Sequence, residues 1–100
     1  MGIALKTHAL DLPLDERALS KLRWRCRRGM LENDLFIERF FGRFGAKLTT
    51  RQGLAMSELM NLSDNDLLDL QLGRQALKQV DATLDRADVI EVLGMLRDKL

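Results

Sequence analysis

Apolar residues recur every three or four positions along most of the chain, the spacing that places side chains on one face of an α-helix. Asp15 is placed to cap a helix at its N-terminal end, and Gly29 suits the position that follows a C-terminal end. The pattern therefore predicts a first helix from about Glu16 to Arg28. Its apolar stripe consists of Leu19, Leu22, Cys26 and Met30.

The segment LFIERFFGRF, residues 35–44, predicts a second helix that supplies much of the core. It contains all four phenylalanines of the chain, and aromatic side chains bury large apolar areas. Gly42 and Gly45 weaken this helix, and Gly45 is placed to end it. The apolar residues that fall within one arc of the helix are Phe36, Ile37, Phe40, Phe41 and Phe44.

Capping signals indicate where three further helices lie. Thr49 and Gln52 match the T-x-x-Q capping box and predict a third helix, while Ser63 is placed to cap a short fourth helix that stops at Gly73. The segment QALKQV leaves open whether an extra turn precedes the last helix. The inward residues of the third helix are expected to be Ala55, Met56, Leu59 and Met60. Those of the last helix are expected to be Val89, Ile90, Val92, Leu93, Leu96 and Leu100.

These segments together predict an all-α protein, a small bundle of about five short helices. The chain shows no strand-like alternation and no internal repeat, and its abundant leucine and single proline favour helices over sheet. Residues 1–13 are expected to form a flexible N-terminal tail that Pro13 closes. Residues 14–100 are expected to form one helical-bundle domain, since 100 residues are enough for a single modest core.

Charge is distributed unevenly although the net charge is only +1. Residues 1–51 hold eleven Lys and Arg against six Asp and Glu, whereas residues 52–100 hold five against nine. One uniform nucleic-acid-binding face is therefore not implied. Cys26 is the single cysteine, so it has no internal disulfide partner, and the start MGIALKTHAL is neither a signal peptide nor a membrane span. A cytoplasmic protein without a membrane partner is expected.

The residue types needed for most catalytic and metal sites are missing from the sequence. His8 is the only histidine and lies in the predicted tail, and Cys26 lies on the apolar stripe. No cluster has the spacing of metal ligands, and no glycine-rich loop matches a nucleotide-binding motif. The sequence therefore predicts a binding protein rather than an enzyme.

The stretch RWRCRRGMLEND, residues 23–34, holds the only tryptophan. On a helical wheel with Leu19 at zero, Trp24 falls at about 140° and Arg28 at about 180°, away from the apolar stripe. Arg28 would then pack on Trp24 beside the bare backbone of Gly29. This arrangement predicts an exposed anchor for another protein. The alternatives are a Trp24 covered by another helix, a Gly29 that only ends a helix, and a Glu32 that opens the next helix or pairs with Arg28.

The segment RRGMLEND, Arg27 to Asp34, resembles the R-G-x-x-E signature of the SdhE family of succinate dehydrogenase flavinylation factors. The likeness covers residues 19–73, including the upstream LRWRC and the later LMNLSDNDLLD. The sequence departs from the family pattern in two places. Leu70 stands where the family usually has a tryptophan, and the third helix offers Leu54 and Met56 in place of an aromatic residue.

The resemblance implies a five-helix bundle that promotes covalent attachment of FAD to the flavoprotein subunit of succinate dehydrogenase, and in some bacteria of fumarate reductase. The implied contact residues are Arg28, Gly29 and Glu32, with Trp24 as an apolar anchor and Asp34 as a weaker addition. One monomeric factor is expected per flavoprotein subunit. The FAD belongs to the client, so no cofactor is expected to bind tightly to this chain.

Two alternatives to this function remain open. The six basic residues between Arg17 and Arg28 are compatible with a nucleic-acid binder, although Glu32 and the acidic second half oppose it. A toxin-neutralising role, attached to some relatives of the family, is not separated by these residues from other kinds of protein binding.

Overall fold

The computed structural model describes residues 10–97, which form a bundle of helices without a strand in that range. Two 3₁₀ turns, η1 (Gly45–Lys47) and η2 (Ala82–Leu84), separate longer elements. The predicted all-α class is confirmed, and the undecided segment before the last helix does contain an extra turn, α6. The helices are α2 (Glu16–Arg25), α3 (Leu31–Phe44), α4 (Thr50–Leu59), α5 (Asp64–Gln71), α6 (Leu77–Val80) and α7 (Ala87–Arg97).

Several helix ends follow the predicted capping signals, but α2 ends earlier than predicted and α3 begins at Leu31, four residues before the predicted segment 35–44. Asp15 accepts a hydrogen bond from the Ala18 amide at 2.7 Å, and the Thr49–Gln52 capping box closes the start of α4. Ser63 caps α5, and Gly73 follows that helix with a φ of +74°. However, α2 ends at Arg25, three residues earlier than predicted, with Cys26 as its C-cap.

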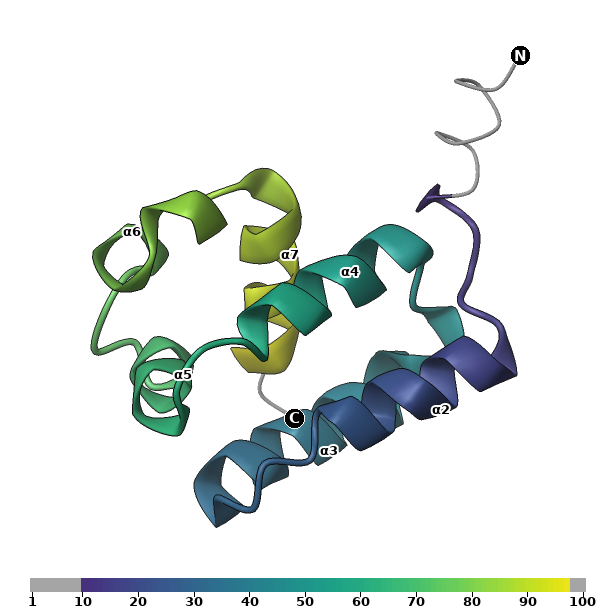
Figure 1. Cartoon of the computed structure of the whole chain (residues 1–100), viewed down its shortest axis with the longest axis horizontal. Helices are drawn as coiled ribbons and strands as arrows, with labels where there is room; N and C mark the ends of the chain where they lie inside the picture. The colour runs from purple at the N-terminus through teal and green to yellow at the C-terminus, as the bar shows by residue number, and fades with distance from the viewer. Residues whose placement is uncertain (1–9, 98–100) are drawn as a thin grey trace.

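The core lies where α7 packs against α4, α3 and α5 (Figure 1). Phe40 and Phe41 of α3 are buried and meet edge to face at 5.2 Å, whereas Phe36 and Phe44 are only half-buried. All of the inward residues predicted for α4 are buried. Ile90 was predicted to face the core, but it is 50% exposed, and Leu100 lies outside the described residues.

The end of the predicted tail is joined to the bundle. The backbone around Pro13 pairs with that around Thr49, because Leu14 N–H donates to Leu48 C=O at 2.8 Å and Thr50 N–H donates to Leu12 C=O at 2.9 Å. Residues 1–9 of the tail lie outside the described range. These hydrogen bonds hold the start of α2 beside the start of α4. The helices α2 and α3 run alongside each other (Figure 1), and residues of both line one groove.

Candidate functional site

The turn between α2 and α3 places the signature residues at one end of the bundle. Gly29 has a φ of +86°, a conformation in which a side chain is strained, so a glycine is required there for backbone reasons. A Cβ built at Gly29 would meet nothing within 4 Å. Gly29 was predicted to follow α2 directly, but that helix already ends at Arg25. The turn is therefore open to an approaching molecule at the backbone of Gly29.

Trp24 lies on the outer face of α2, as the helical wheel predicted. Its side chain is 73% exposed, so the alternative of a core tryptophan is wrong. The guanidinium of Arg27, not of Arg28, lies over the indole ring at 5.4 Å from its centroid. The predicted stacking of Arg28 on Trp24 is wrong, because the helix ends before Arg28 and its regular rotation no longer applies.

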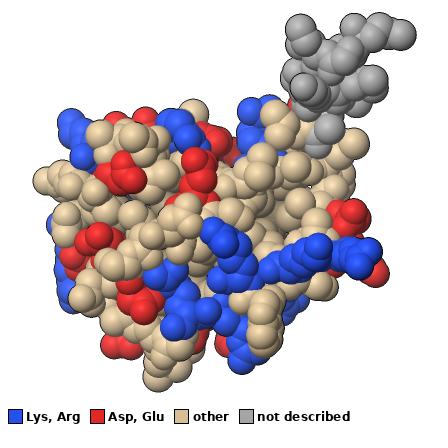
Figure 2. Space-filling model, viewed as in Figure 1, with Lys and Arg blue, Asp and Glu red and all other residues tan. Residues whose placement is uncertain are grey.

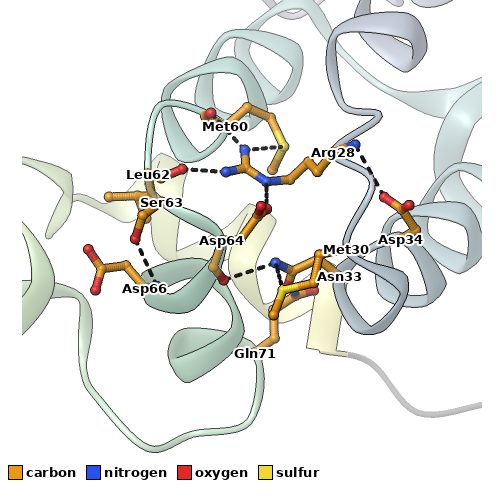
Figure 3. A network of polar contacts seen from close by, with 10 residues as sticks. All are labelled: Arg28, Met30, Asn33, Asp34, Met60, Leu62, Ser63, Asp64, Asp66 and Gln71. Atoms are coloured by element: carbon orange, nitrogen blue, oxygen red, sulfur yellow. Dashed lines mark hydrogen bonds and ion pairs between the residues drawn. The ribbon is translucent and has the colours of Figure 1, made fainter.

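The side chain of Arg28 turns inward and fastens the turn to the loop between α4 and α5 (Figure 3). It donates to the carbonyls of Met60 at 2.8 Å and Leu62 at 2.5 Å and to the carboxylate of Asp64 at 2.5 Å. Only 13% of the Arg28 side chain is exposed. A planar guanidinium suits this role because it can donate in several directions at once.

Glu32 and Asp34 both lie in the first turn of α3, where the helix dipole favours negative charge. Glu32 is exposed, and Arg28 pairs with Asp64, so the proposed ion pair of Glu32 with Arg28 is not formed. Asp34 is half-buried and accepts a hydrogen bond from the Arg28 amide at 3.3 Å. Glu32 is therefore free to meet a partner, while Asp34 supports the turn.

A buried polar network that was not predicted from the sequence lies under the turn. Asn33 is fully buried and donates to the Asp64 carbonyl at 3.0 Å, and it accepts from the Gln71 side chain at 2.5 Å (Figure 3). A sequence signal for it existed, because Asn33 occupies the same helical face as Ile37 and Phe40. A buried polar residue needs a partner, and here the partners tie the start of α3 to α5.

Two pKa shifts follow from this packing. The Arg28 guanidinium, hydrogen-bonded to Asp64, lowers the pKa of that carboxyl below its ordinary value of 3.8. Burial raises the pKa of the Cys26 thiol to about 12, which keeps it protonated and unreactive near neutral pH. Cys26 is therefore a core residue, as its place on the apolar stripe indicated.

A groove of about 480 Å³ runs between α2 and α3 beside Trp24. Its walls carry both signs of charge. One wall holds Arg23 of α2 and Arg27 of the following turn, and the other holds Asp34 and Glu38 of α3. Lys and Arg side chains gather over α2 in Figure 2, whereas Asp and Glu lie mostly over other parts of that face. The groove and the exposed indole together form a surface that can bind another protein.

Other kinds of site are not indicated. Within residues 10–97 no group of three or more His, Cys, Asp and Glu side chains could hold a metal ion. In the same range no helix has the length and apolar character that crossing a bilayer requires.

Of the departures from the family pattern, Leu70 and Met56 are fully buried and Leu54 is exposed on α4. Leu70 therefore replaces the usual tryptophan at a core position and not at the surface.

Fold and site define a small helical bundle with an exposed tryptophan beside a groove lined by charged residues. Comparison with known proteins identifies the family: the model of the family described as "Flavinator of succinate dehydrogenase" matches residues 20–97 of this chain. The chain belongs to that family. Members of the family are assembly factors and not catalytic enzymes, so the predicted non-enzymatic class is confirmed.

Several relatives that share one name match half or more of the chain. A protein of Ralstonia nicotianae named FAD assembly factor SdhE is 42% identical over 94 residues, which cover 94% of this chain and 96% of the relative. Its namesake in Legionella pneumophila strain Lens is 29% identical over 85% of this chain and 98% of its own length. Another in Coxiella burnetii is 41% identical over 56% of this chain and 68% of its own length. No solved structure matches the chain.

Proposed function

We propose that this protein binds the flavoprotein subunit of succinate dehydrogenase and promotes the covalent attachment of FAD to it. Family membership and the names of the relatives support a role in FAD assembly. The observation that carries the binding surface is the 73% exposed Trp24, which lies near the open backbone of Gly29. Tryptophan is one of the residue types enriched among the dominant contacts of protein interfaces.

Each residue of the signature has a different part in this proposal. Trp24 supplies apolar contact area, Gly29 lets a client backbone approach, and Glu32 offers a carboxylate to a basic or amide group. Arg28 acts as a positioning residue, since its bonds to the α4–α5 loop hold Gly29 and Glu32 in place. Asp34 supports the same turn through the Arg28 amide.

The chemistry of attachment belongs to the client, and this chain acts by preferring one client state. A binding partner shifts a conformational equilibrium only by the difference between its affinities for the two states. The chain therefore binds the FAD-loaded subunit in the arrangement that allows the bond to form. One monomer serves each subunit, FAD stays with the client, and the corresponding subunit of fumarate reductase is a second client in bacteria that have it.

Flavin fluorescence of the denatured flavoprotein subunit in a gel tests the proposal, because only covalently bound flavin remains with the band. Trp24→Ala and Glu32→Ala are expected to lower the fluorescence toward the level without the factor. Both side chains are exposed, so circular dichroism should show an intact bundle.

Two matched variants control for the loss of an exposed residue. Ile90→Ala removes an exposed apolar residue of α7, and Glu16→Ala removes a first-turn carboxylate of α2, so both should leave fluorescence unchanged. Normal flavinylation with both Trp24→Ala and Glu32→Ala would refute the assignment of this surface. Capture of nucleic acid instead of a flavoprotein, with steep loss of binding in salt, would favour the basic-patch alternative.

A further inference from the structure

A second apolar surface borders the signature on the opposite side of α3 from Trp24. Three leucines are exposed on this side of the molecule: Leu31 at 68%, Leu35 at 59% and Leu72 at 47%. Leu35 and Leu72 line a groove of about 290 Å³ between α3 and α5, together with Phe36 and Leu68. A groove lined mainly by apolar side chains is a candidate site for binding an apolar segment of a partner.

The internal packing of the bundle does not use these leucines. The buried face of α3 is formed by Asn33, Ile37 and Phe40 with Phe41. At about 100° per residue, Leu31 and Leu35 lie about 40° apart, and Phe40 lies on the opposite side of the helix from Leu31. The two leucines therefore point away from the core that holds α3 in place.

The groove is continuous with the surface assigned to the flavoprotein subunit. Glu32 is one of its lining residues, and it is also the exposed carboxylate of the signature. Leu31 follows Gly29 by two positions, so a protein that contacts Gly29 and Glu32 must also approach Leu31 and Leu35. At the far end of the groove, the Arg39 guanidinium lies over the Phe36 ring at 5.2 Å from its centroid.

We infer that the α3–α5 groove is a second docking surface for the same flavoprotein subunit, an inference that rests on the proposed function. The occupant is an apolar segment of the subunit that lies over Leu35 and Leu72 and brings a basic group opposite Glu32. The subunit then holds the factor on both sides of α3, with Trp24 on one side and the leucines on the other. Apolar contacts on both sides of α3 fix the orientation of the factor more firmly than the contacts of the signature alone.

Affinity for the purified FAD-loaded flavoprotein subunit, measured by isothermal titration calorimetry, tests this inference. Leu35→Ala and Leu72→Ala are each expected to weaken binding by at least about fivefold, the effect of removing a significant interface side chain. Ile90→Ala, which shortens an equally exposed apolar residue on α7, should bind like the unmodified chain. Circular dichroism confirms that each variant is folded.

The outcomes separate this inference from the function on which it rests. Normal binding by Leu35→Ala and Leu72→Ala, with weakened binding by Trp24→Ala, overturns the second surface and leaves the proposed function intact. No binding by the unmodified chain, or normal binding by Trp24→Ala and Glu32→Ala as well, overturns both. A dimer in sedimentation equilibrium that Leu35→Ala dissociates would assign the groove to a second copy of the chain, against the flavoprotein subunit.

Discussion

Replacement of Arg28 by alanine should destabilise the bundle, although a signature residue would ordinarily be expected to affect only partner binding. The substitution removes two hydrogen bonds from a cation to the main-chain carbonyls of Met60 and Leu62. Hydrogen bonds that involve a charged group contribute about 1.5–3 kcal/mol each, and the lower end gives a loss of about 3 kcal/mol. The bond to Asp64 adds less, because 40% of that side chain is exposed to solvent.

Urea and thermal unfolding followed by far-UV circular dichroism measure this loss. In a domain of this size each kcal/mol lowers Tm by about 4–8 °C, so a decrease on the order of 15 °C is expected. Arg28→Lys keeps the positive charge but lacks the planar guanidinium that donates in several directions, so its loss of stability should be about half that of Arg28→Ala. Arg51→Ala breaks a solvent-exposed pair with Asp11 and should cost less than about 1 kcal/mol. An unchanged Tm for Arg28→Ala would show that this side chain does not fasten the turn.

Two further predictions concern titratable groups close to the same turn. Because the folded-state pKa of Asp64 lies below the ordinary value of 3.8, its contribution to stability is fully present above 3.8 and is lost as the pH falls from there through the lower folded-state pKa. Asp64→Asn should therefore lower the urea midpoint near pH 7 and make its decline below about pH 5 shallower, and parallel curves for the two proteins would contradict this. Cys26, with its pKa raised from 9.0 to about 12, should have a thiolate fraction about a thousandfold below that of an ordinary thiol at pH 8. Iodoacetamide should label it rapidly only after unfolding in urea, and equal rates in the native protein would show that the thiol is accessible.

Local signals in the sequence were sufficient to locate most of the helices. The Thr49–Gln52 capping box, the Ser63 cap and the glycine after α5 act through bonds within a few residues of each other, so no distant part of the chain is needed to predict them. Periodicity placed Trp24 away from the apolar stripe of α2, and the structure confirms this position, although a Trp24 covered by another helix was also compatible with the sequence. The position predicted for Arg28 was wrong because it assumed 100° per residue beyond Arg25, where α2 ends.

The sequence by itself determined an all-α bundle and a glycine-containing turn with a carboxylate close behind it, since these depend on helical periodicity and local backbone preference. It left open whether Trp24 faces outward or is covered by another helix, and the structure decided for the outward position. Only the tertiary structure decided that Arg28 points inward, because its acceptors at Met60, Leu62 and Asp64 are more than thirty residues away along the chain. The same holds for the groove between α3 and α5, which exists only because helices distant in sequence pack side by side. Contacts between distant segments follow from the packing of the whole core, and no short stretch of sequence specifies them.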